Sequence, residues 1–232
     1  MIINHMHLIK IFSDLCPVQK KTFCLLMISW CFLNNSHAQN SFSGEFVYRI
    51  TKVDSIPNPL FTGQDQEQKL IVYAKDSLLK TVNFNSITGT QESLIHILLK
   101  KTIVLLKFDE QGYAIRMNNN LQKYDESDYK FEKKCGLPLR IGGLKSKKMI
   151  MSHPDLKHDL TCYYSKKIDS KYSHCFDHVP GLPTLFFLAL EDGLYRYELE
   201  SKKEYETPIS LFMIPEGYQV MSFEEFMEID NH

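Results

Sequence analysis

The sequence is poor in the features that mark a membrane-spanning or nucleic-acid-binding protein. Its most apolar stretch, Phe23 to Leu33, is about half of the roughly 20 residues that a spanning helix needs. Its 27 basic and 28 acidic residues leave a formal net charge of −1. This balance indicates neither nucleic acid nor an anionic membrane surface as a partner. The sequence also has no internal repeat and no low-complexity tract.

The motifs of several large enzyme classes are missing as well. There is no G-x-x-x-x-G-K-[ST] loop, no G-x-G-x-x-G turn and no G-x-S-x-G elbow. Gly142-Gly143 lacks the strand–loop–helix context of a phosphate site, and no Ser-His-Asp arrangement can be read from the sequence. We therefore expect a protein that is not an enzyme and that uses no cofactor.

The first 38 residues have the pattern of a secretory signal peptide. Lys20-Lys21 precede the apolar run, and the small-residue pattern Ser36-His37-Ala38 stands before Gln39. We expect residues 1–38 to be removed on export and residues 39–232 to form a single β-rich domain. Cleavage would remove three basic residues and one acidic residue, so the remaining 194 of 232 residues would carry a net charge of −3.

Cysteine is scarce in the exported part. Three of the six cysteines lie in the leader, which leaves Cys135, Cys162 and Cys175. In an oxidising compartment one pair can form and one thiol is left over, and three pairings are possible. We favour Cys162–Cys175 because the segment between them is short and polar. Such a bond would stabilise the fold by about 3 kcal/mol in the chain-entropy model.

Apolar and polar side chains alternate at a period of two through most of the exported part. Residues 44–53 and 194–200 show this alternation, and turn formers such as Glu191-Asp192-Gly193 separate such runs. Closely spaced strands favour antiparallel meanders over βαβ units. We therefore predict a mainly β fold.

Two segments depart from this alternation. Residues 118–134 are polar and predict a surface loop, with a short helix near residues 127–133. Residues 205–213 are the last strand candidate, and Pro208 within them indicates an edge strand or a bulge.

The C-terminus predicts a different kind of element. Ser222 and Glu225 have the spacing of a capping box, in which each side chain accepts from the backbone N–H of the other residue. Phe223, Phe226 and Met227 then share one helical face. We therefore expect a short helix that packs on the sheet.

One local cluster has the residue types of a metal site. His174 and His178 are spaced at i, i+4, with Asp177 between them, and imidazole and carboxylate groups are ligands of zinc. A helix would have to present both rings on one face, whereas Pro180-Gly181 follows at once and disfavours a helix. We expect a polar loop here and no metal, and keep the three residues as weak candidates.

Two apolar runs are the candidates for a ligand-binding lining. They extend from Ile95 to Leu106 and from Leu182 to Leu188, and both are apolar on both faces in places. They form an ordinary core, or they line a partly open sheet that wraps an apolar ligand. The residues assigned to such a lining are Ile95, Ile97, Leu99, Leu105, Leu182, Leu185 and Phe187.

Several short segments of the C-terminal half follow one another in an order that is typical of one exported family. They are Ile141-Gly142-Gly143-Leu144, Cys162-Tyr163-Tyr164-Ser165, Pro180-Gly181-Leu182-Pro183-Thr184-Leu185, Tyr195-Arg196-Tyr197-Glu198-Leu199 and Phe212-Met213-Ile214-Pro215-Glu216-Gly217-Tyr218. With them the chain resembles the GLPGLI-type envelope proteins and related uncharacterised exported proteins of Gram-negative bacteria. Thr184-Leu185 stands where the motif has a second Gly-Leu.

The resemblance implies a fold similar to that of the periplasmic lipoprotein carriers. This is a curved antiparallel sheet, half-barrel-like, packed on a short C-terminal helix; a β-sandwich is the alternative. The resemblance also implies a location in the periplasm or in association with the outer membrane. It implies no activity, since a fold alone does not define a function.

These expectations combine into one functional hypothesis with two alternatives. The first is an exported, non-enzymatic cell-envelope protein that binds an apolar ligand such as a lipid or an acyl chain. The second is a structural or interaction module of the envelope that binds no ligand and contacts an envelope protein. The third is a metal-dependent envelope hydrolase. None of them requires nucleic acid or a transmembrane span in the mature chain.

Overall fold

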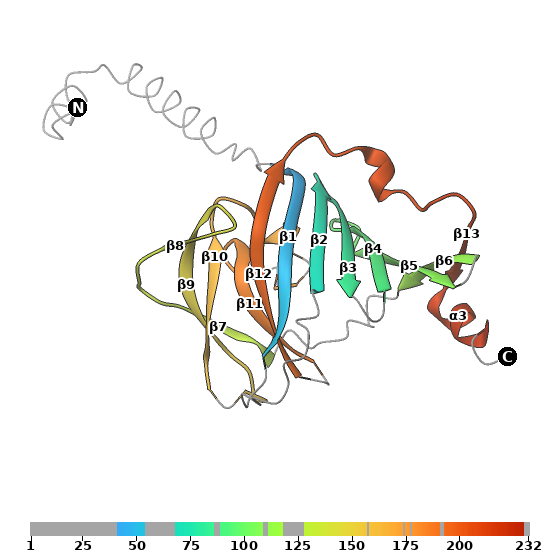
Figure 1. The fold of residues 1–232 in the computed structure, drawn as a ribbon. Helices are drawn as coiled ribbons and strands as arrows, with labels where there is room; N and C mark the ends of the chain where they lie inside the picture. The colour runs from blue at the N-terminus through green and yellow to red at the C-terminus, as the bar shows by residue number, and fades with distance from the viewer. Residues whose placement is uncertain are drawn as a thin grey trace, which may run out of the picture. The chain divides into compact units, whose positions relative to one another are not determined.

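A computed structural model describes residues 41–53, 68–85, 89–108, 111–117, 128–156, 158–173, 175–176, 178–190 and 193–229. All of them belong to one compact unit, Ser41–His232. Expectations for residues 1–38 lie outside the described residues. The described part is mainly β, with one short C-terminal α-helix (Figure 1).

The elements follow one another in a long series of strands. The first strands are β1 (Ser43–Val53), β2 (Gln68–Lys75), β3 (Leu78–Asn85), β4 (Gly89–His96), β5 (Lys101–Phe108) and β6 (Gln111–Met117). The next are β7 (Lys130–Lys133), β8 (Leu139–Ile141), β9 (Leu144–Ser152) and β10 (Leu160–Ser165). The last elements are η3 (Ser170–Tyr172), β11 (Leu182–Leu190), β12 (Gly193–Glu204), η4 (Ile209–Phe212), β13 (Tyr218–Ser222) and α3 (Phe223–Ile229).

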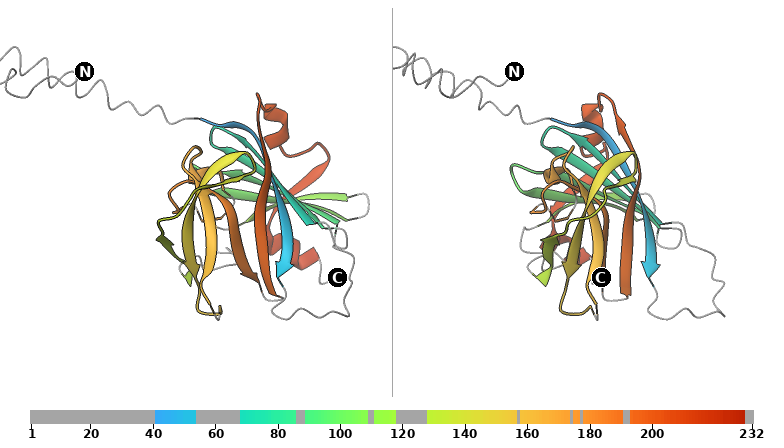
Figure 2. Two further views of the ribbon diagram at one scale, coloured as in Figure 1. Left: turned by 60° about the vertical axis from the view of Figure 1, so that its left-hand side comes forward. Right: turned by 90° about the vertical axis from the view of Figure 1, so that its left-hand side faces the viewer.

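The strands form one sheet in the order β13-β6-β5-β4-β3-β2-β1-β12-β11-β10-β9-β7, with β8 pairing only with β9. Neighbours are antiparallel except β13, which runs parallel to β6. Figure 2 shows that the sheet is curved, and its two end strands, β13 and β7, do not pair with each other. The predicted curved antiparallel sheet is therefore confirmed.

One face of the sheet, which we call the inner face, carries the main core. On β1 the side chains of Phe46, Tyr48 and Ile50 are buried, at a period of two. Phe46 pairs with Val72 of β2, and Ile50 pairs with Tyr197 of β12. Because paired residues project to the same side of a sheet, the alternation read from the sequence fixes which side of each strand enters the core.

The connection from β10 to β11 covers this inner face and fills it. Its side chains Ile168, Tyr172, Cys175, Phe176 and Val179 are all buried within the main core. Within this connection, Tyr172 is the last residue of η3, and its hydroxyl oxygen accepts from the backbone N–H of Phe42 at 2.8 Å. The connection therefore serves as part of the core.

The segment after β12 crosses the opposite face of the sheet, which we call the outer face. The predicted strand over residues 205–213 is wrong: β12 ends at Glu204, and Pro208 begins the 3₁₀ turn η4. Proline has no N–H to donate to a strand ladder, so this segment cannot add a regular strand. In Figure 1 it runs from the end of β12 to β13.

A second, smaller cluster lies on the outer face. Leu94, Leu105 and Ala114 are buried there, and Ile214 and Tyr218 of the crossing segment pack against them. The crossing segment then pairs as β13 with β6, at the end of the sheet farthest from β7 in strand order.

The predicted capping box and helix are confirmed at α3. The backbone N–H of Ser222 donates to the Glu225 carboxylate at 2.7 Å, and the backbone N–H of Glu225 donates to the Ser222 hydroxyl at 3.2 Å. These hydrogen bonds lower the pKa of Glu225. Phe226 stacks on Phe108, with ring centroids 6.1 Å apart. The helix thus packs on β5 and β6, far from β11 in strand order.

The short helix predicted near residues 127–133 is also wrong. Residues 130–133 form β7, which pairs with β9 through Phe131 and Met151 among others. The sequence does carry the period of a strand here, because Tyr129 and Phe131 alternate with the polar residues Asp128, Lys130 and Glu132. The alternation is short, and the polar residues around it led to the prediction of a loop with a helix.

Candidate functional site

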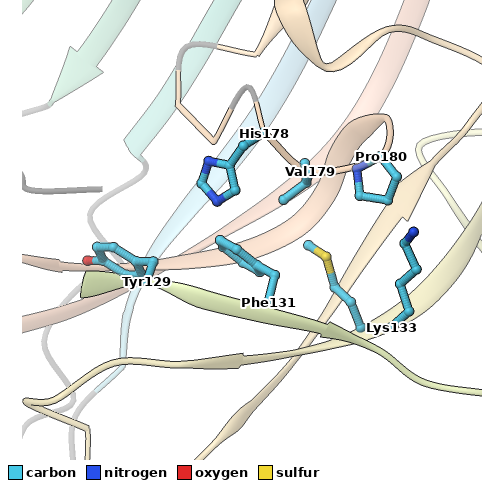
Figure 3. Close-up of a pocket in the computed structure, with 7 residues that line it drawn as sticks. Tyr129, Phe131, Lys133, His178, Val179 and Pro180 are labelled. Atoms are coloured by element: carbon cyan, nitrogen blue, oxygen red, sulfur yellow. The ribbon is translucent and has the colours of Figure 1, made fainter. Parts of the chain in front are cut away.

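A pocket of about 210 Å³ opens between β7, β9 and the loop that leads into β11. Its lining combines aromatic, aliphatic and basic groups, contributed by Tyr129, Phe131, Lys133, Met149, His178, Val179 and Pro180. Figure 3 shows Tyr129, Phe131 and Lys133 in one row, facing His178, Val179 and Pro180. The pocket is smaller than the roughly 300 Å³ at which sites for drug-sized ligands begin.

The alternation of β7 places two of the lining side chains. Phe131 and Lys133 are two residues apart and so project to the same side of the strand. Lys133 pairs with Met149 of β9, whose side chain is buried and closes the floor of the pocket. The edge strand therefore provides one wall with an apolar base and a cationic end.

The loop wall is held by backbone conformation and hydrogen bonds. Phe176 has φ +58°, in the left-handed region that a bulky side chain rarely adopts. The N–H of Val179 donates to the carbonyl of Phe176 at 3.3 Å, and the N–H of Gly181 donates to the carbonyl of Val179 at 2.9 Å. This tight turn directs Phe176 into the core and leaves His178 and Pro180 at the pocket.

An aromatic cluster connects the pocket to the main core. The ring of Phe176 lies 4.9 Å from the rings of both Tyr129 and Phe131, and 5.8 Å from that of Phe186, in edge-to-face arrangements. The Tyr129 hydroxyl accepts from the backbone N–H of Ala189 at 2.9 Å. Burial raises the pKa of Tyr129, so its hydroxyl stays neutral at ordinary pH. The wall on this side is therefore packed on the core through aromatic contacts, and its tyrosine is uncharged.

The positive charge at the pocket comes from its exposed rim. Lys133 is exposed, and among the described residues no carboxylate forms an ion pair with its ammonium group. The apolar walls and this one cation suit a small apolar group that carries a negative charge, because such a ligand leaves no buried charge unpaired.

The residues that the sequence assigned to an apolar lining are dispersed in the structure. Leu182 and Leu185 are buried in the main core, and Ile95, Ile97 and Phe187 are half-buried against it. Leu99 is 57% exposed beyond the end of β4, and Leu105 lies in the outer-face cluster. None of the seven lines the pocket described above.

The metal candidates fall mostly outside the described residues. His174 and Asp177 lie outside them, whereas His178 lines the pocket. No group of three or more His, Cys, Asp or Glu side chains suited to a metal occurs in the part of the chain that the structure describes.

Cys162 and Cys175 are both buried on the inner side of the sheet. Burial raises the pKa of the Cys162 thiol to about 12, which keeps it protonated and unreactive at neutral pH. Cys162 carries a thiol in this structure, and its pairing with Cys175 stays a prediction.

The sequence hypothesis missed most of the lining of this pocket. Tyr129, Phe131 and Lys133 lie in the segment interpreted as a polar loop, and Met149 lies in a strand with no distinguishing motif. The alternation over residues 129–133 was the one available signal. The contact with the loop at His178 depends on the order of strands in the sheet, which a local pattern does not contain.

Comparison with known proteins gives only remote structural likenesses. No family model matches the chain, and no curated protein matches it. A structure of PNGF-II in a P21 crystal form superposes with a TM-score of 0.46 at 14% identity, over 81% of this chain and 33% of PNGF-II. A chain of the MucA/MucB complex of Pseudomonas aeruginosa gives a TM-score of 0.44 at 12% identity, over 79% of this chain and 59% of that chain.

This chain thus spans about a third of the first protein and less than two thirds of the second. At such TM-scores neither likeness bears on what the chain binds. Within the described residues, no helix is long and apolar enough to cross a membrane.

Proposed function

We propose that this chain is an exported, non-enzymatic binding protein of the cell envelope. Its pocket would take a small apolar group that carries a negative charge, such as a short acyl chain with its carboxylate. The observation that carries the proposal is the union of apolar walls with the exposed Lys133 ammonium group in one pocket. Export is supported by the signal-peptide pattern of residues 1–38.

The size of the pocket limits the ligand. At about 210 Å³ it has room for a single short chain or ring and not for a complete diacyl lipid. The wider inner face offers no alternative where the β10–β11 connection fills it with Tyr172 and Phe176, which are fully buried. A ligand of this kind would lie with its tail on Phe131 and Met149 and its charge at Lys133.

The probe that tests this is octanoate, titrated into the protein and followed by two-dimensional NMR or calorimetry. We expect octanoate to bind and octanol to bind about tenfold less tightly, because only octanoate pairs with the Lys133 ammonium group. The substitution Lys133→Met keeps most of the aliphatic stem and removes the charge. It should therefore abolish the preference for octanoate over octanol.

Lys134→Met is the matched control. Lys134 is the next residue and is also exposed, but it pairs with Glu132 and does not line the pocket. This variant should retain the preference of the wild type. Octanoate that fails to bind at millimolar concentration, or that binds equally well to the Lys133→Met variant, would contradict the proposed ligand chemistry.

A second candidate function rests on the filled inner face. Tyr48, Phe176 and Phe186 occupy it together, and the Tyr48 hydroxyl donates to the Pro183 carbonyl at 2.9 Å. This closed packing favours an envelope interaction module that binds no ligand. Native mass spectrometry of the folded protein separates the two: a native mass equal to the denatured mass, together with a failed octanoate titration, supports the interaction module.

A further inference from the structure

The charges of this chain are unevenly distributed along the sequence. Residues 133–148 contain six basic residues and no acidic one. The whole chain has a net charge of −1, so with +6 in this segment the other residues together carry −7. The near-neutral total therefore hides a strongly basic segment.

The fold brings this segment together with two further cations, Lys166 and Lys167, which directly follow β10. Arg140 of β8 pairs directly with Lys145 of β9, and the backbone N–H of Lys134 donates to the carbonyl of Lys148 at 3.4 Å. Figure 1 shows β8 and β9 near β10 at the left-hand margin of the ribbon. We call the resulting surface the basic edge, made by Lys133, Lys134, Arg140, Lys145, Lys147, Lys148, Lys166 and Lys167.

The basic edge is largely unneutralised and stays open to solvent. All its members are exposed except Lys148, which is half-buried. Lys134 pairs with Glu132 at 2.9 Å, and Lys167 lies close enough to Glu204 to help Lys202 lower the pKa of that carboxylate. Among the described residues the other members form no ion pair. Like charges that face each other across a strand pair destabilise a sheet, so Arg140 and Lys145 do not serve stability.

Two leucines project from the middle of the basic edge. All seven residues from 134 to 140 are exposed, and within this run Leu137 is 89% exposed and Leu139 is 48% exposed. The run leaves the edge of the sheet between β7 and β8, where Gly136 and Pro138 interrupt the strand. The structure thus presents an apolar tip that is surrounded by cations.

The combination of exposed leucines and surrounding cations distinguishes among the partners that the basic edge can bind. Lysines on an edge strand can simply prevent the association of one sheet with another. That role requires neither the exposed leucines nor Lys166 and Lys167, which lie after β10. An acidic protein surface would match the cations and leave the leucines in water. An anionic bilayer matches both, because leucines enter the headgroup–acyl boundary while lysine and arginine stems extend to the phosphates.

We propose that the basic edge docks this protein on an anionic lipid surface, with the loop of residues 135–139 inserted into it. The contact is peripheral and uses no spanning segment. It goes beyond the proposed ligand binding and does not depend on it, since Leu137, Lys145 and Lys147 do not line the pocket.

The test uses the full chain and two kinds of vesicle, phosphatidylcholine alone and phosphatidylcholine with phosphatidylglycerol. Sedimentation gives a partition coefficient for each kind of vesicle. The ratio of the coefficient on the anionic vesicles to that on the neutral vesicles cancels any contribution that is common to both. We expect the wild-type ratio to exceed one and to fall with added salt. Each cation near such a surface contributes about fivefold, so the double substitution Lys145→Gln/Lys147→Gln should lower the ratio about 25-fold.

The matched control is Lys100→Gln/Lys101→Gln, two exposed lysines where the turn after β4 meets the first residue of β5. It removes the same charge from another part of the sheet and should leave the ratio near that of the wild type. Leu137→Ser keeps every charge and should lower partitioning onto the anionic vesicles about tenfold, since an exposed leucine adds nothing unless it enters the bilayer. All three variants change exposed side chains and should keep the melting temperature of the wild type.

Three results would overturn the proposal. The first is a wild-type ratio of one, and the second is an equal loss in the Lys145/Lys147 and Lys100/Lys101 variants. The third is a Leu137→Ser variant that partitions as the wild type does while soluble polyglutamate competes for the basic edge. That result would assign the surface to an acidic protein partner. Octanoate binding, measured without vesicles, is unaffected by any of these outcomes.

Discussion

Gly181 adopts a backbone conformation that an L-residue can take only with strain at this place. Its φ is +154°, and a Cβ atom there would lie 2.3 Å from the carbonyl oxygen of Ser165. That oxygen belongs to the last residue of β10, so it cannot move without disturbing the pairing with β11. The Pro-Gly step therefore lets the chain turn from the pocket loop into the core strand β11.

Replacing Gly181 by alanine should lower the free energy of unfolding by about 3 kcal/mol, because the backbone strain adds to the clash with Ser165. Urea denaturation measures the loss. Gly89→Ala is the control, since Gly89 also has a positive φ, +80°, but its added Cβ would meet no atom within 4 Å. The control should lose about 1 kcal/mol, the cost of the backbone conformation alone. Equal losses in both variants would show that the contact with Ser165 is not restrictive.

Single residues were predicted well from the sequence where the signal is local. The alternation of Phe46, Tyr48 and Ile50 and the reciprocal capping by Ser222 and Glu225 both depend on neighbours within a few residues. The face that a leucine occupies is less local. Leu105 lies on the outer face because of its register with Ala114, whereas its neighbours in sequence project to the other side. An apolar run that is apolar on both faces cannot reveal this division.

At the scale of elements, the segment between β12 and β13 departs most from what the sequence predicts. Its attachment to the sheet depends on Thr207, which is fully buried. The Thr207 hydroxyl donates to the carbonyl of Ala74 at 3.2 Å and accepts from the Ser43 hydroxyl at 3.1 Å. The Lys75 ammonium group donates to the Thr207 carbonyl at 3.0 Å. Distant strands thus hold this segment, and no local pattern marks it.

Thr207→Val should therefore lower the free energy of unfolding by about 2 kcal/mol, because the isosteric change removes the side-chain donor to the Ala74 carbonyl and the acceptor of the Ser43 hydroxyl. Hydrogen exchange should also become faster in β13, because β13 directly follows this segment and pairs with β6. Thr51→Val on the exposed side of β1 is the control and should change stability by less than about 0.5 kcal/mol. If exchange in β13 stays unchanged while Thr207→Val is destabilising, the segment is not what holds β13 in place.

At the scale of the whole molecule, the packing of the inner face decides between a carrier with a wide cavity and a protein with a small pocket. Phe176 is fully buried and contacts rings from three directions: Tyr129, Phe131 and Phe186. The four residues come from β7 and the residue before it, from β11, and from the connection between β10 and β11. The first of these segments is far from the other two in the sequence. The alternation predicted the strands and the family resemblance implied a curved sheet, but neither could show that the connection folds back to fill it.

The substitution Phe176→Ala tests how far this ring closes the inner face. Removing a buried phenylalanine costs about 3–5 kcal/mol and leaves an apolar cavity if the surroundings do not collapse. We expect a loss in that range by urea denaturation, and a partial recovery in the presence of benzene, which binds dry apolar cavities. The wild type should gain no stability from benzene.

Phe84→Ala is the control, because Phe84 is 45% exposed on β3 and its loss should cost less than about 1 kcal/mol. A Phe176→Ala variant as stable as this control would mean that the β10–β11 connection lies loosely on the sheet. The inner face would then be open to an acyl chain larger than the 210 Å³ pocket can hold. A large loss that benzene partly restores would instead place the ligand, if the octanoate titration succeeds, in the small pocket beside Lys133 alone.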